Sequence, residues 1–126
     1  MALGLALASA EIVACDQSIR RGDERWLLPG PPGCSLLDKP VGIIGYGSIA
    51  RALRPLLAPF GCPVSAFDPW PSEGYLRSQG VRAASLEALL SESRVIFVLA
   101  VPSAENRALL TRELLSASVP MRCWSW

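Results

Sequence analysis

The sequence predicts an α/β fold with a doubly wound parallel sheet, and three observations support this. Three short, mainly apolar runs indicate strands, and the first of them, residues 41–44, is typical of a strand that is buried on both faces. A helical pattern follows each run, so strands and helices alternate along the chain. Hydrophobic residues make up 51% of the 126 residues and charged residues 18%, which indicates a buried core and argues against disorder. This length allows one domain or part of one.

Residues 1–27 are predicted to form one long helix. Residues 2–26 are rich in apolar side chains without strand-like alternation, and charged residues join them from Glu11 onward. The first ten residues imitate a signal peptide, but they lack its basic start. They are also far shorter than the roughly 20 apolar residues that span a membrane. Four prolines then interrupt residues 28–40, which are predicted to form a Pro/Gly linker.

Residues 41–118 carry the alternation and are predicted to hold about three strands. The expected strands are 41–44, 64–67 and 95–100. The pattern fails after residue 116, so residues 119–126 are predicted to be a divergent tail without a strand. The expected helices and their boundary signals are 48–60, ended by Gly61 and bent near Pro55; 72–79, followed by a turn at Gly80; 86–90, capped by Ser85; and 104–116, capped by Ser103.

The motif that carries chemistry is the sequence GYGSIA at residues 45–50, which has the pattern G-x-G-x-x-G/A. A strand precedes it and a helix follows, so the glycines fall where a pyrophosphate can approach backbone N–H groups at a helix N-terminus. Asp68 follows the next strand, about 20 residues on, where a carboxylate can accept hydrogen bonds from the adenosine ribose and repel a 2′-phosphate. Together these features predict the first half of a Rossmann-like sheet that binds NAD.

Three other interpretations compete with dinucleotide binding. Gly42 and Gly47 have the spacing of a P-loop, but Ser48 stands where that loop needs its lysine. A methyltransferase stays possible, although Ile43 and Ile44 occupy positions where the adenosylmethionine loop usually carries an acid. The glycines and Asp68 could also do no more than shape the fold.

Composition excludes several classes of function. The chain has no histidine, so it supplies neither a Ser-His or Cys-His couple nor an imidazole base. Its four cysteines form no C-x-x-C pair, so neither a metal site nor a disulfide framework is predicted, and free thiols in the cytoplasm fit best. A net charge of +1 predicts neither a nucleic-acid nor a membrane partner.

Six stretches of residues 10–116 resemble the D-isomer-specific 2-hydroxyacid dehydrogenases. They are VGIIGYGSIA at 41–50, FG at 60–61, FDP at 67–69, SLEALL at 85–90, VP at 101–102 and ENR at 105–107. The resemblance implies that NAD is bound by the backbone of the glycine motif, by Asp68, by the loop 100–102, and near Asn106. The expected cofactor-binding residues are Gly45, Tyr46, Gly47, Ser48, Ile49, Asp68, Ala100, Val101, Pro102 and Asn106.

The resemblance also implies what this sequence lacks. In the family, the catalytic arginine, and the histidine with its glutamate, lie downstream of the third predicted strand, and residues 119–126 contain no Asn-x-x-Arg-Gly signature. No catalytic residue is therefore predicted. We expect the NAD-binding part of an oxidoreductase that transfers hydride between NAD(H) and D-2-hydroxy or 2-keto acids, inactive as an isolated fragment. The alternatives are a non-catalytic NAD-binding module and a non-functional truncated remnant.

A half-domain with strand order 3-2-1 would leave the strand at 41–44 without a neighbour on one side. An apolar strand with an open edge is a template for association. The sequence therefore predicts a homo-dimer or other association through that edge. The opening helix, residues 1–27, resembles the long interdomain helix that precedes the nucleotide domain in the family and contributes to dimer contacts there.

Overall fold

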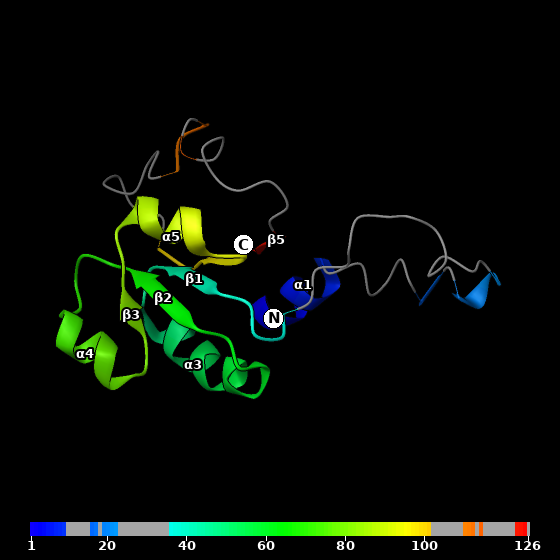
Figure 1. Ribbon diagram of the computed structural model, residues 1–126, viewed down its shortest axis with the longest axis horizontal. Coiled ribbons are helices and arrows are strands. Elements are labelled where there is room, and N and C mark those ends of the chain that lie inside the picture. Colours follow the sequence, from blue (N-terminus) through cyan, green and yellow to red (C-terminus); the bar gives the residue numbers. More distant parts are fainter. Residues whose placement is uncertain are drawn as a thin grey trace.

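The computed structural model describes residues 1–9, 16–17, 19–22, 36–101, 110–112, 114 and 123–125. Its centre is a five-stranded sheet with the order β3-β2-β1-β4-β5, in which every paired strand is parallel to its neighbour (Figure 1). The predicted Rossmann-like parallel sheet is confirmed. The strands are β1 (Val41–Ile44), β2 (Val64–Phe67), β3 (Arg82–Ala83), β4 (Val95–Val98) and β5 (Cys123–Ser125).

The predicted strand order is wrong, because two strands were not foreseen. β3 has two residues and β5 has three, so neither is long enough to show an apolar run or an alternation. β3 pairs with β2 at the edge of the sheet, the place that was predicted for the strand at 95–100. The run that starts at Val95 therefore lies beside β1, pairing Val41 with Val95 and Ile44 with Val98. β1 thus has neighbours on both sides, and its predicted open edge does not exist.

The helices of residues 48–92 lie close to their predicted positions. They are α3 (Ser48–Leu57), the 3₁₀-helix η2 (Ala58–Phe60), α4 (Glu73–Ser78) and α5 (Leu86–Glu92). α3 continues through Pro55, and Gly61 ends this helical stretch with a left-handed φ of 65°. Ser72 and Ser85 cap α4 and α5 by accepting from the amides of Tyr75 and Ala88. Most of the predicted helix 104–116 lies outside the described residues; among those described, Leu110 and Thr111 are not helical, whereas Arg112 and Leu114 are.

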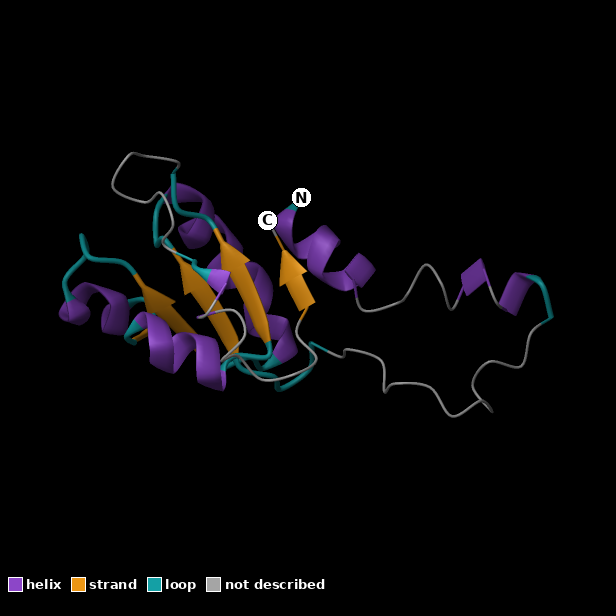
Figure 2. Cartoon of the chain, turned by 90° about the horizontal axis from the view of Figure 1, so that it is seen from above, coloured by secondary structure: helices purple, strands orange, loops and turns teal. Residues whose placement is uncertain are grey.

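The predicted helix of residues 1–27 is observed over a shorter range. α1 (Ala2–Ser9) is helical, as is the backbone of residues 16–17 and 19–20. A turn follows at residues 21–22, where Gly22 has a φ of 77° that an α-helix does not contain, so the helix does not run through it. Residues 10–15, 18 and 23–35 lie outside the described residues. α1 lies beside β5 and also contacts α3 (Figure 2).

Helices cover both faces of the sheet, with α5 on one face and α3 and α4 on the other (Figure 1). Alternate strand residues point to opposite faces. Val41 and Ile43 of β1 therefore join the core cluster of α3 and α4, whereas Ile44 packs with the leucines of α5. At Gly42 an added Cβ would lie 2.6 Å from the side chain of Leu89, so this glycine lets α5 approach β1 closely.

Candidate functional site: a cavity where three strands end

A cavity of about 250 Å³ opens where β1, β2 and β4 end. β2 lies on one side of β1 and β4 on the other, so β1 and β4 form the switch point of the sheet. Ligands of open α/β sheets bind at this point, outside the carboxyl ends of the strands. The lining residues follow or end these strands: Ile44, Gly45, Gly47, Phe67, Asp68, Pro69, Trp70, Leu99, Ala100 and Val101.

Gly45 begins the loop after β1 in a position that only glycine fits. Its N–H donates to the carbonyl of Phe67 at 2.9 Å, which continues the pairing of β1 with β2. Its φ is +89°, and an added Cβ would lie 2.6 Å from the backbone nitrogen and the Cα of Ala100. The absence of a side chain therefore lets the loop cross directly over the end of β4.

Gly47 ends the same loop in open space. An added Cβ at this position would meet no atom within 4 Å among the described residues. Gly47 is also the N-cap of α3, and no side-chain hydrogen bond caps the helix there. The N-terminus of α3, which carries a partial positive charge, therefore reaches the cavity with no capping side chain at its N-cap.

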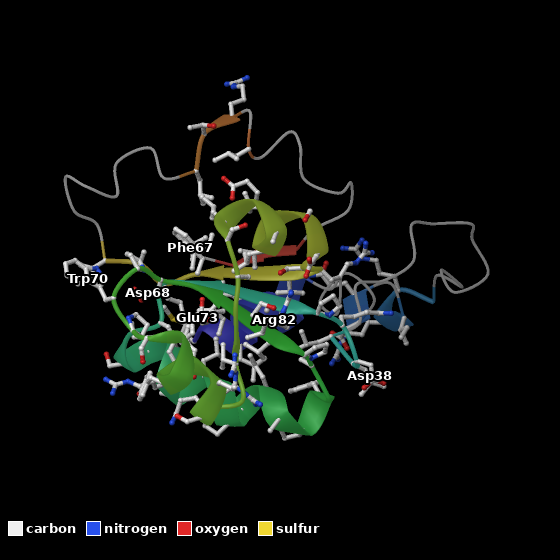
Figure 3. The ribbon with its side chains drawn as sticks, turned by 60° about the vertical axis from the view of Figure 1, so that its left-hand side comes forward. Asp38, Phe67, Asp68, Trp70, Glu73 and Arg82 are labelled. Atoms are coloured by element: carbon white, nitrogen blue, oxygen red, sulfur yellow. The ribbon has the colours of Figure 1, made fainter. Side chains whose placement is uncertain are left out.

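Asp68 follows β2 and connects the two sides of the cavity. One carboxylate oxygen, Oδ2, accepts a hydrogen bond from the backbone N–H of Tyr46 at 2.6 Å. The other, Oδ1, accepts from the backbone N–H of Trp70 at 2.9 Å. Figure 3 shows Asp68 and Trp70 together at this end of the sheet and Asp38 at the opposite end. The carboxylate is thus oriented by the protein backbone on both sides.

Tyr46 contributes its backbone to this loop and its side chain to the core. The residue is only 4% exposed and packs in the cluster with Ala50 and Leu53 of α3. Its hydroxyl has no hydrogen-bond partner among the described residues. Burial raises the pKa of the Tyr46 phenol above 10.0, partly offset by the nearby Arg54 guanidinium. The side chain is therefore not part of the cavity lining.

Eight of the ten expected cofactor-binding residues are described by the structure, and they fall into three groups. Gly45, Gly47, Asp68, Ala100 and Val101 line the cavity together. Ser48 and Ile49 form the exposed first turn of α3 and do not line it. Tyr46 touches Asp68 through its backbone, as described above. The remaining two, Pro102 and Asn106, lie outside the described residues.

Five lining residues were not expected from the sequence. They are Ile44, Phe67, Pro69, Trp70 and Leu99. Trp70 is the most informative of them, because it lines the cavity and yet is 84% exposed. Its position two residues after the strand-terminal Asp68 is a signal that could have identified it. Ile44 and Leu99 have no such signal, because they meet only through the pairing of β1 with β4, where the Leu99 N–H donates to the Ile44 carbonyl at 2.8 Å.

Asp68 is the one ionisable residue among the described residues that line the cavity. A ligand's phosphates would therefore meet backbone N–H groups and the helix dipole, with no Lys or Arg side chain from this lining. Within the part of the chain that the structure describes, no three His, Cys, Asp or Glu side chains are grouped to hold a metal ion. The helices described there are also all too short or too polar to cross a membrane.

A second cavity, of about 300 Å³, lies beside α4 and β3, away from the switch point. Two basic residues line it, Arg77 and Arg82, and Arg82 is already bound to the carboxylate of Glu92 and to the hydroxyl of Ser65. The cavity at the switch point is therefore the better candidate for a functional site.

Comparison with known proteins decides the family. Residues 2–121 match the NAD binding domain of the D-isomer specific 2-hydroxyacid dehydrogenases. This chain belongs to that family. The expected family and cofactor are confirmed.

Curated relatives of this NAD-binding domain are longer proteins. It is 32% identical over 120 residues to the D-3-phosphoglycerate dehydrogenase of Mycobacterium tuberculosis, covering 94% of this chain and 22% of that protein. It is 38% identical over 91 residues to the D-lactate dehydrogenase of Escherichia coli, covering 72% of this chain and 27% of that protein. The chain thus spans about a quarter of the length of these relatives.

Solved structures agree with the fold. The D-lactate dehydrogenase of Salmonella superposes with a TM-score of 0.73 at 30% identity, over 93% of this chain and 35% of that one. The D-lactate dehydrogenase of Escherichia coli, in its apo form, gives a TM-score of 0.72 at 32% identity, over 93% and 37%. In both comparisons the matched region is about a third of the dehydrogenase chain.

Proposed function

We propose that this domain binds NAD(H) in the cavity at the switch point and serves an oxidoreductase that acts on D-2-hydroxy acids. The observation that carries the proposal is the meeting of two features at one cavity: the N-terminus of α3 without a side-chain cap, and the carboxylate of Asp68. A helix N-terminus favours a diphosphate, and a strand-terminal carboxylate accepts hydrogen bonds from ribose hydroxyls.

The proposed contacts follow from this arrangement. The backbone of Gly47, Ser48 and Ile49 would hold the diphosphate, because Gly47 leaves room and the other two form the first turn of α3. Asp68 would hold the adenosine ribose, beside an apolar wall made by Pro69 and Trp70. The residues after β4 would contact the remainder of the dinucleotide: Ala100, Val101, Pro102 and Asn106.

Asp68 also supports a preference for NAD over NADP. A 2′-phosphate would face its negative charge, and the described lining offers no Lys or Arg to compensate. Calorimetric titration of the chain with each nucleotide tests this, with NAD⁺ expected to bind more tightly. Asp68→Ala should weaken the binding of NAD⁺ far more than the binding of NADP⁺. Equal losses would remove Asp68 from the ribose site, and no heat with either nucleotide in the unaltered chain would refute the proposed function.

The substrate class is inferred from the family and from relatives that are named D-lactate and D-3-phosphoglycerate dehydrogenases. Bound NAD(H) supplies the hydride acceptor or donor for such chemistry. The chain contains no histidine, so its own residues hold and orient the dinucleotide but provide no imidazole to move the hydroxyl proton. We therefore propose that the 126-residue chain alone does not reduce 2-keto acids. NADH consumption with pyruvate or hydroxypyruvate by the pure chain would overturn this.

We also propose dimerisation. The argument cannot be an open edge of β1, because β1 has a neighbour on both sides, and it is instead the apolar surface of α1. α1 has no charged side chain, and Leu5 on it is 45% exposed. An apolar helix with an exposed face favours contact with a second copy. Sedimentation velocity of the chain measures this, and a monomer at all concentrations would contradict it.

A further inference from the structure

The hydrogen bonds of Asp68 assign this residue a task that precedes any contact with ribose. Its Oδ2 accepts from Tyr46, 22 residues earlier in the chain, at a donor–acceptor distance of 2.6 Å. Its Oδ1 accepts from Trp70 within its own loop at 2.9 Å. Hydrogen bonds to an ionised acceptor are shorter and stronger than those between neutral groups. One carboxylate thus joins the glycine loop to the end of β2.

The glycine loop needs such a connection because of its composition. Tyr46 stands between Gly45 and Gly47, and glycine loses more conformational freedom on ordering than any other residue. The amide of Gly45 is held by the carbonyl of Phe67, which anchors the start of the loop. The bond from Tyr46 to Asp68 anchors its middle, directly before the N-cap of α3.

We propose that Asp68 is a positioning residue for the diphosphate site as well as a ribose ligand. By holding the amide of Tyr46, it keeps Gly47 and the first turn of α3 where a diphosphate meets them. This inference rests on the proposed function, because it assumes that a nucleotide binds in this cavity. It differs from that function in assigning Asp68 an effect on ligands that have no ribose hydroxyls.

The two roles predict opposite signs for such a ligand. If Asp68 contacts only the ribose, then removing its carboxylate costs nothing to a nucleotide without 2′- and 3′-hydroxyls. It should even improve binding, because a negative charge near a diphosphate is lost. If Asp68 holds the loop, the same substitution weakens binding, because the loop must then be ordered by the ligand.

The experiment compares ADP with 2′,3′-dideoxyadenosine 5′-diphosphate by calorimetric titration of the full chain and its variants. Asp68→Ala should weaken binding of the dideoxy nucleotide about tenfold, which corresponds to the loss of one hydrogen bond to a charged group. The affinity of Asp68→Asn for the dideoxy nucleotide should fall between those of the unaltered chain and Asp68→Ala. The amide oxygen of asparagine can accept from one of the two backbone N–H groups, whereas its NH₂ group cannot accept from the other. Asp38→Asn removes the same charge at the opposite end of the sheet, and should leave both affinities unchanged.

A second measurement needs no ligand and also separates failure of this inference from failure of the proposed function. Amide hydrogen exchange at Tyr46 should be slow in the unaltered chain and clearly faster in Asp68→Ala, while the amides of β1 keep their rates. A dideoxy nucleotide that binds Asp68→Ala as tightly as the unaltered chain overturns the inference, as does unchanged exchange at Tyr46. Absence of any nucleotide binding to the unaltered chain refutes the proposed function, and the exchange rate then still decides whether Asp68 holds the loop.

Discussion

The two ends of the glycine loop have the same residue in opposite surroundings. At Gly45 an added Cβ would lie 2.6 Å from the backbone of Ala100, whereas at Gly47 it would meet nothing within 4 Å. Gly45 also has a φ of +89°, whereas Gly47 has an ordinary φ of −86°. The first glycine therefore serves the packing of the loop on β4, and the second keeps the cavity open. A single sequence motif thus combines a requirement of folding with a requirement of binding.

The largest expected effect is that of Gly45→Ala. The substitution combines a backbone conformation that costs an alanine about 1–3 kcal/mol with a clash against the backbone of Ala100, which cannot turn aside. We expect a loss of about 3 kcal/mol or more in the free energy of unfolding, measured by chemical denaturation. A loss below 1 kcal/mol would show that the loop does not depend on this close approach.

Gly47→Ala should separate binding from stability. Its backbone conformation suits alanine, and N-cap glycine is better than alanine by about 1 kcal/mol or less, so the fold should persist. The new methyl group occupies space that the cavity leaves open, so we expect NAD⁺ affinity to fall about tenfold or more, about 1.4 kcal/mol. Calorimetry together with thermal unfolding measures both quantities. Unchanged affinity would mean that the diphosphate does not pass Gly47.

Tyr46→Phe tests the residue between the two glycines. Its buried hydroxyl has no partner among the described residues, so we expect its removal to raise stability by about 1 kcal/mol while NAD⁺ affinity stays the same. Lower stability would show that the hydroxyl is bonded.

The pH dependence of the same variant follows from the raised pKa of Tyr46. The folded state keeps the phenol neutral where the unfolded chain already ionises. This contribution to stability is present below the unfolded pKa of about 10 and is lost as pH rises through the folded pKa. Thermal unfolding from pH 8 to 11 should thus decline less steeply in Tyr46→Phe. Burial also raises the pKa of the Cys62 thiol, so some alkaline decline should remain.

The smallest expected effect is that of Ser85→Ala, which calibrates what a cap contributes where no ligand is expected. The Ser85 hydroxyl accepts from the amide of Ala88 at 3.2 Å at the start of α5, whereas α3 has no such cap. We expect a loss of about 0.5–1 kcal/mol in unfolding free energy and no change in NAD⁺ affinity. A change in affinity would indicate that α5 and the cavity are coupled.

Local patterns were sufficient for the elements that position the site. The strands at 41–44 and 64–67, the serine cap of α5 and the stop at Gly61 depend on neighbours within a few residues, and the structure confirms them. The Ser72 cap of α4 is equally local but was not predicted. The same holds for the glycines between a strand and a helix, and for the position of Asp68 directly after β2. These features follow from hydrophobic period and backbone freedom, which a sequence displays directly.

Only the tertiary structure decided which strands are neighbours and how the side chains near the cavity are used. Arg82 and Ala83 form a strand too short to show a hydrophobic period. Because this strand occupies the far side of β2, Val95–Val98 lies beside β1 instead, and β1 and β4 form the switch point. Tyr46 looks like a loop residue, but its ring packs in the core and its amide binds a carboxylate 22 residues away. Pairings between distant residues depend on the summed burial and hydrogen bonding of the whole sheet, and no short stretch of sequence encodes that sum.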